Sequence, residues 1–216
     1  MKKTFREPVN TITHMIGAIL AGIGMMVMFG IIINQHELEP RFVVSVLAFG
    51  LGLMALYSAS SYYHGISPDN KNRLLRMKRT DHAMIFILIA GSYTPFCLLG
   101  TAGYALTGLL AAVWIVAAIG VLLMIFWIGM PRWLNTVLYI GLGWFAVFGL
   151  KTLFQTLPLP AFVLLFVGGV FYTVGGIMYG LKKPNLSPLF GHHEIFHLFV
   201  LAGSLCHYIA VAFFLL

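Results

Sequence analysis

The chain has 216 residues, of which 60% are hydrophobic and only 9% are charged. A soluble domain has roughly a quarter of its residues charged, so this composition excludes an ordinary soluble domain and indicates a membrane protein. The formal net charge of +7 does not indicate nucleic-acid binding, because the basic residues lie in short connections between apolar runs, as membrane proteins place them. We therefore expect one integral membrane domain over residues 1–216 and no nucleic-acid partner.

The apolar runs predict an all-α membrane protein with seven transmembrane helices, since about 20 apolar residues are needed for each crossing. The uncharged stretch from Ala83 to Met130 is too long for one crossing, and the sequence GTAG at 100–103 predicts a turn within it. The predicted spans are 12–33, 42–63, 83–99, 106–128, 134–150, 159–181 and 195–216.

The Lys and Arg residues of the connections predict how the bundle is oriented. Three precede the first span, five lie between the second and third, one between the fourth and fifth, and two between the sixth and seventh, which makes eleven on the N-terminal side. Only Arg41 and Lys151 lie on the opposite side. Cytoplasmic connections collect Lys and Arg, so we expect the N-terminus in the cytoplasm and the C-terminus outside.

This topology brings polar side chains from three spans to the cytoplasmic end of the bundle. Ser60 and His64 lie at the end of the second span, and Asp81 lies at the start of the third. His193 and His197 lie at the start of the seventh. Ionisable residues are expensive in a membrane and mark functional sites there. The sequence therefore predicts one polar site built from these three helix ends.

His193 and His197 are four residues apart in HEIFH, so they project from one helical face and can share a metal. The letters also fit the H-E-x-x-H helix of zinc proteases, but that motif usually takes a third ligand downstream in a soluble or juxtamembrane domain. Here the third ligand is more economically His64, at the same depth. Three histidines leave one position of tetrahedral Zn²⁺ open for water or substrate. Asp81 can accept a hydrogen bond from that water or act as general base, and Ser60 can orient the water or a carbonyl group.

Each of these residues also has a structural interpretation. The histidines can bond to backbone or lipid headgroups, Asp81 can stabilise the start of the third span, and Ser60 can mediate a helix contact. The convergence of His64, His193, His197 and Asp81 at one depth favours the metal site.

Other polar residues are expected to be structural. Asn10 is interpreted as the N-cap of the first span, and His14 as a packing residue in its first turn. His207 lies ten residues beyond His197, which is about 15 Å along the helix, so we expect it to form an internal hydrogen bond away from the metal.

Three neighbours of the proposed ligands are expected to face elsewhere. His192, Glu194 and His82 point about 100° away from the ligand faces of their helices. We therefore assign none of them to the metal, and Glu194 is not interpreted as the catalytic base.

Taken in chain order, these motifs resemble the hemolysin III family, the bacterial branch of the group that contains the progestin and adiponectin receptors. The resemblance covers the whole chain and rests on EPVNTITH (7–14), SSYYH (60–64), RTDHAMIFILIAGSYTPF (79–96) and HEIFH (193–197). It implies a seven-helix bundle in the bacterial cell membrane, with a zinc ion near the cytoplasmic face.

The resemblance also implies a role for each site residue. The family's three zinc-binding histidines map to His64, His193 and His197. Its aspartate, which contacts the metal through water, maps to Asp81, and its serine maps to Ser60. The family is similar to the alkaline ceramidases, which hydrolyse a lipid amide with a comparable zinc site.

These observations favour a zinc-dependent hydrolase that acts on an amide or ester bond of a membrane lipid. A second hypothesis is a non-enzymatic sensor or regulator of membrane state with a structural zinc, in which Asp81 binds the metal directly. A third is a cytolytic protein, as the hemolysin name implies. A pore would have polar residues along the full length of several spans, whereas the sequence predicts them at one end only.

Overall fold

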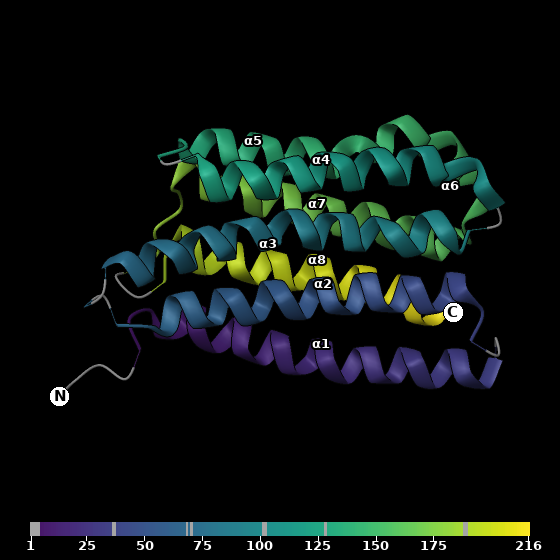
Figure 1. The fold of residues 1–216 in the computed structure, drawn as a ribbon, viewed down its shortest axis with the longest axis horizontal. Helices are drawn as coiled ribbons and strands as arrows, with labels where there is room; N and C mark the ends of the chain where they lie inside the picture. Colours follow the sequence, from purple (N-terminus) through teal and green to yellow (C-terminus); the bar gives the residue numbers. More distant parts are fainter. Residues whose placement is uncertain are drawn as a thin grey trace.

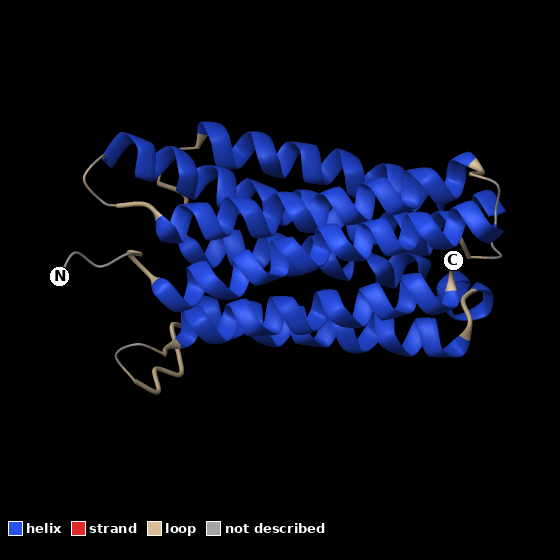
Figure 2. Ribbon diagram, turned by 90° about the horizontal axis from the view of Figure 1, so that it is seen from below, coloured by secondary structure: helices blue, strands red, loops and turns tan. Residues whose placement is uncertain are grey.

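The structure, a computed structural model, describes residues 5–35, 38–67, 69, 71–100, 103–127, 129–187 and 190–216. Within these residues the chain forms long helices that run along one common axis (Figure 1). A view turned by 90° shows helix throughout, joined by short loops (Figure 2). Seven helical segments of the described chain are long and apolar enough to cross a membrane. The prediction of an all-α membrane protein with seven spans is therefore confirmed.

The helices follow the predicted spans in order. They are α1 Pro8–Gln35, α2 Pro40–Gly65, α3 Lys71–Leu98, η1 Gly103–Leu106, α4 Thr107–Phe126, α5 Arg132–Gly143, η2 Trp144–Gly149, α6 Leu150–Thr156, α7 Leu159–Leu181 and α8 His192–Phe214.

The third span begins earlier than its hydrophobic run. Helix α3 starts at Lys71 rather than at Ala83, and its first turns carry the basic residues of the connection. Lys and Arg are good helix formers, so the helix extends beyond the apolar segment. Asp81 consequently lies within α3 and not at its start, and it does not cap this helix.

The fifth span is interrupted by the short 3-10 helix η2, which the hydrophobic pattern did not indicate. The break is flanked by Gly143 and Gly149. Tyr93 of α3 satisfies backbone groups at the break, because its hydroxyl donates to the carbonyl of Gly143 at 2.5 Å and accepts from the amide of Ala146 at 2.7 Å. Irregular backbone at membrane depth is tolerated where protein groups satisfy it.

Small residues let the helices approach closely, as membrane bundles require. A Cβ added at Gly168 of α7 would lie 3.1 Å from the carbonyl oxygen of Gly203 on α8, and the reciprocal distance is 3.0 Å. Gly91 of α3 packs in the same way against the backbone of Ala48 on α2. Backbone therefore meets backbone at these two interfaces.

The ends of the helices that carry the predicted site lie together at one end of the bundle, here called the site end. The start of α1, the end of α2 and the starts of α3, α5 and α8 lie at the left of Figure 1, while α8 ends at the right. Helix α8 packs against both α7 and α1. The cytoplasmic location of the site end stays a prediction.

Replacing Gly91 with Ala is expected to destabilise the bundle, because the new methyl group would overlap the carbonyl oxygen of Ala48, which is backbone and cannot rotate away. We expect a loss of about 1–3 kcal/mol, as for other overpacked interfaces. Gly30→Ala is the matched control, since nothing lies within 4 Å of a Cβ at Gly30. Thermal unfolding in detergent measures both variants, and equal melting temperatures would contradict the close α2–α3 contact.

Candidate metal centre

The structure brings the three predicted ligands together at the site end. The ring centroids are 4.8 Å apart for His64 and His193, 4.9 Å for His64 and His197, and 5.0 Å for His193 and His197. One ring nitrogen from each residue lies within 4.8 Å of the others. His64 and His197 are buried, and His193 is half-buried. The rings therefore form a nearly equilateral cluster.

Local sequence sets the position of each histidine. Helix α8 begins at His192 because Glu194 caps it, accepting a hydrogen bond from the amide of Gly191 at 2.8 Å. This start places His193 and His197 in the first two turns, on one face. His64 lies in the last turn of α2, which ends where the chain becomes extended at Ile66.

The cluster fits the requirements of a metal site. Two nitrogens bound to one zinc at ~2.1 Å are at most ~4.2 Å apart, so the three rings need only a small contraction to share an ion. Nδ1 of His64 already contacts a carboxylate oxygen of Glu7 at 2.6 Å, whereas its Nε2 is buried and has no hydrogen-bond partner. Buried ring nitrogens normally have a partner. A metal ion in the cluster would supply one for His64.

Asp81 and Ser60 lie beside the cluster, as predicted. Both are buried, with 7% and 1% of their surface exposed. Their side chains interact with each other, and both line one cavity together with His193 and His197. A carboxylate and a hydroxyl group are therefore available next to the histidine rings.

The first helix supplies contacts that sequence reasoning missed or misassigned. Asn10 is not an N-cap, because α1 begins at Pro8 and places Asn10 inside the helix. Its amide instead donates to Glu7 at 3.1 Å and to Glu194 at 2.8 Å. The sequence signal for these contacts is the presence of Glu7 and Asn10 just before an apolar run. The same residues are also typical of a helix cap, so the sequence alone does not indicate the contacts.

Glu7 lies just before the first span and is ionised. Burial favours the neutral acid, but the interactions with His64, led by its hydrogen bond, outweigh this effect and lower the pKa of Glu7 to about 2. Asn10 and Arg6 add to the lowering. Glu7 is therefore a carboxylate acceptor for the ring of His64.

His14 packs at the site end, as expected. It is buried and stacks on His197 with a centroid separation of 3.7 Å and an interplanar angle of 13°. This contact fixes the plane of the His197 ring from the α1 side.

His82, His192 and His207 follow the predictions with one exception. Nε2 of His207 lies 3.2 Å from the carbonyl oxygen of Leu165, so it is an internal hydrogen-bonding residue. His192 faces away from the cluster and contacts Asn185 at 2.8 Å. His82 was expected to face elsewhere, but it lines the same cavity as Asp81.

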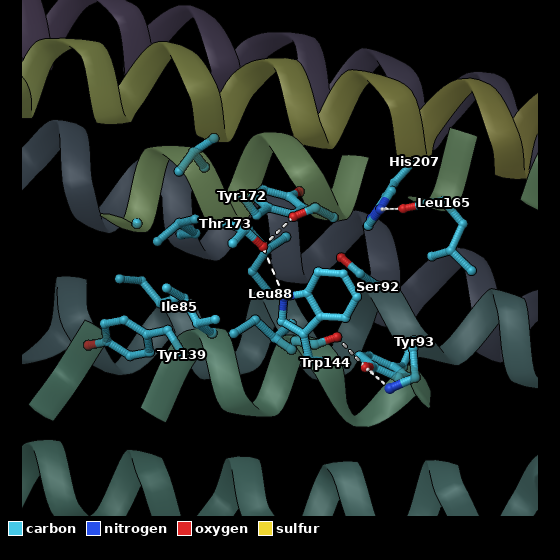
Figure 3. Close-up of a pocket in the computed structure, with 18 of the residues that line it drawn as sticks. Ile85, Leu88, Ser92, Tyr93, Tyr139, Trp144, Leu165, Tyr172, Thr173 and His207 are labelled. Carbon is cyan, nitrogen blue, oxygen red and sulfur yellow. Dashed lines mark hydrogen bonds between the residues drawn. The ribbon is translucent and has the colours of Figure 1, made fainter. Parts of the chain in front are cut away.

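The cavity is lined by His193 and His197 of the cluster and extends to Ser92 and His207 deeper in the bundle. Figure 3 shows these two deeper residues among its lining. Apolar side chains from α3, α5, η2, α7 and α8 form most of its wall. Trp144, Val147 and Phe166 line it and are also 40%, 53% and 52% exposed on the outside of the bundle. Only one layer of side chains therefore separates the cavity from the lipid-facing surface between η2 and α7, where Trp144 donates to Thr173 at 3.1 Å.

Buried polar residues also lie deep in the bundle, contrary to the expectation that they gather at one end only. Ser92, Ser204 and His207 are each 5% exposed. Ser204 accepts a hydrogen bond from Tyr57 at 2.6 Å and shares another with Tyr172 at 2.8 Å. The expectation failed because the sequence pattern does not show which hydroxyl groups of a span face the interior.

Comparisons with known proteins agree with this architecture. A family model described as "Haemolysin-III related" matches residues 2–208. The chain is 37% identical over 215 residues to "Hemolysin-3 homolog" of Bacillus subtilis (strain 168), covering 98% of this chain and 95% of the relative. It is 35% identical over 210 residues to "Hemolysin-3" of Bacillus cereus, with coverage of 97% and 92%.

A more distant relative is human "Monocyte to macrophage differentiation factor", which is 25% identical over 172 residues, or 78% of this chain and 69% of the relative. The bacterial relatives and the seven apolar helices together indicate a multi-pass bacterial membrane protein. The family match spans nearly the whole chain, and the chain therefore belongs to the haemolysin III family.

Proposed function

We propose that this protein is a zinc-dependent hydrolase that cleaves an amide or ester bond of a membrane lipid. The observation that carries the proposal is the cluster of His64, His193 and His197 beside Asp81, at the head of an apolar cavity. We also infer, from the distribution of Lys and Arg, that this site lies near the cytoplasmic face.

His64, His193 and His197 would hold the zinc ion. Three neutral imidazoles suit zinc, whose bonds to histidine nitrogen are ~2.0–2.1 Å long. A zinc ion held in this way supplies Lewis acidity, which polarises a carbonyl group and makes water nucleophilic near neutral pH.

Asp81 and Ser60 have the polar roles around the reacting bond. Asp81 accepts the proton of the attacking water and can return it to the leaving group, as a general base and acid. Ser60 interacts with Asp81 and holds its carboxylate in place. Because both side chains are buried, bulk water does not compete for these contacts.

The cavity supports a lipid as the substrate. Its mostly apolar wall suits a hydrocarbon chain, and Asp81, His193 and His197 lie together at one part of its lining. A lipid amide or ester joins an acyl chain to a polar headgroup. Such a molecule would place its chain in the cavity and its labile bond beside the histidines, with the headgroup toward the site end.

Purified protein is expected to contain one zinc ion per chain. His64→Ala and His197→Ala should lose this metal, because each removes one of three ligands, and His192→Ala should retain it, because His192 faces Asn185. Metal analysis by mass spectrometry measures the content. A wild-type protein without metal, or ligand variants with unchanged zinc, would contradict the metal site.

Asp81→Asn is expected to abolish hydrolysis while zinc remains bound. The amide keeps the size of the side chain but cannot take a proton, and the loss of a general base lowers rates by about 10²–10⁴. Lipid profiles of membranes that contain wild-type or variant protein measure the effect.

If the wild-type and Asp81→Asn profiles agree for every lipid and both proteins hold zinc, the hydrolase assignment fails. A structural zinc in a sensor or regulator would then explain the site.

Gly169→Leu is expected to reduce turnover of long-chain lipids more than that of short-chain lipids. Gly169 lines the cavity, and nothing lies within 4 Å of a Cβ placed there, so the new side chain can enter the space meant for the acyl chain. Gly30→Leu, on the outer face of α1, is the control. Hydrolysis of a series of acyl-chain lengths in mixed micelles tests this, and an equal reduction at every length would argue against a chain-binding cavity.

A further inference from the structure

We propose that Glu7 is a positioning residue for the metal centre, and that Asn10 and Glu194 extend its action to the second ligand-bearing helix. This inference rests on the zinc site of the proposed function. Helix α1 carries none of the three clustered histidines, yet its first turn and the residue before it contact both α2 and α8.

Glu7 holds His64 at two points. Its carboxylate oxygen Oε2 lies 2.6 Å from Nδ1 of His64, and its backbone amide donates to the carbonyl of His64 at 3.1 Å. The His64 side chain is fully buried, and that of Glu7 is 36% exposed. Two bonds to one residue fix both the backbone of α2 at this point and the orientation of the ring.

The carboxylate also selects the tautomer of His64. A carboxylate oxygen accepts hydrogen bonds, so in a ring that binds a metal through Nε2 the proton lies on the Nδ1 that is 2.6 Å from Oε2 of Glu7. Nε2 then carries the free lone pair, and Nε2 is the buried nitrogen that has no partner in the protein. Partners of this kind orient metal-bound histidines and raise their basicity. Glu7 therefore prepares His64 as a ligand.

Asn10 connects this carboxylate to α8. Its Nδ2 donates to Oε2 of Glu7 at 3.1 Å and to Oε1 of Glu194 at 2.8 Å. An amide group has two N–H donors, so both bonds can form at once and reduce the repulsion between two neighbouring carboxylates. Glu194 lies directly after His193 in the chain. The α2 ligand is thus joined to the α8 ligands through one amide.

Each of the two carboxylates also accepts a hydrogen bond through the oxygen that Asn10 does not contact. Oε2 of Glu194 accepts from the amide of Gly191 at 2.8 Å, where a negative charge is favourable at the start of α8. Oε1 of Glu7 accepts from Nε of Arg6 at 3.1 Å, and the Arg6 guanidinium lies 4.5 Å from the ring centroid of Tyr63. With both oxygens bonded, the Glu7 side chain has one preferred position.

The test is zinc affinity of the full chain, measured by competition with a chelator. Glu7→Ala is expected to weaken binding by about 10–100-fold, the usual effect of losing a partner of a metal-bound histidine. Glu7→Gln should restore part of the affinity, because its amide oxygen still accepts from Nδ1. Glu39→Gln, which alters an exposed carboxylate paired with Arg41, is the matched control and should bind zinc like wild type.

Cobalt provides a readout that a general packing defect would not change in the same way. When Co²⁺ replaces zinc, its visible spectrum reports the geometry of the ligands. Glu7→Ala should change the spectrum of the bound ion, because the ring of His64 is no longer held in one orientation, and Glu39→Gln should leave it unchanged. The melting temperature of metal-free Glu7→Ala is expected to stay close to that of metal-free wild type.

Three results would overturn the inference. A zinc affinity of Glu7→Ala equal to that of wild type would contradict the inference, because the loss of a residue that positions His64 must weaken zinc binding. A lost affinity that is matched by a large fall in metal-free melting temperature, with no rescue by Glu7→Gln, would make Glu7 a purely structural residue. Absence of zinc from wild type would remove the metal centre and the proposed function with it, whereas the first two results leave that function standing.

Discussion

The packing of three imidazole rings, two of them buried, within ~5 Å of one another is the constraint on which the site end depends. Polar groups removed from water need partners, and apolar helices cannot supply them. Glu7, just before α1, provides such a partner for His64, and Asn10 of α1 joins Glu7 to Glu194 of α8. The three helices are therefore joined at one end by hydrogen bonds, while along the rest of their length they pack through apolar and small side chains.

The opposite side of the cluster has a different construction. There His193 and His197 border a cavity with an apolar wall, so the cluster contacts the start of α1 through His64 and His197 and is open toward α3, α5 and α7. The break at η2 belongs to the same side. Tyr93 satisfies the backbone of Gly143 and Ala146, and this allows an irregular segment with Trp144 to form the thin wall between cavity and lipid. A regular α-helix would carry its side chains at different angles along this wall.

The seven spans and the shared face of His193 and His197 could be predicted because each depends on a short-range signal. Span length follows from hydropathy, and the i, i+4 spacing of His193 and His197 fixes their common face. The η2 break left no trace in hydropathy, since 3-10 and α-helix use the same apolar residues. The assignment of Asn10 as a helix cap was wrong because an Asn that caps a helix and an Asn that donates to another helix look alike in a sequence. Only the start of α1 at Pro8 distinguishes the two roles. The contact between Glu7 and His64 joins two distant chain positions, which spacing along one helix cannot reveal.

The hydrogen bonds around the cluster also bear on how the proposed metal binding would be coupled to folding. Glu7, Asn10 and Glu194 make these contacts with protein groups alone, and the contacts join the end of α2 to the start of α8. Nε2 of His64 and Nδ1 of His197 are among the buried ring nitrogens that have no hydrogen-bond partner, as are both ring nitrogens of His14. An unpaired buried polar group costs about 1–3 kcal/mol, and an ion that binds only the folded chain recovers such a cost as stability. A site whose helices are joined by protein contacts, and whose buried ring nitrogens lack partners, therefore favours binding of an ion over rearrangement of the helices.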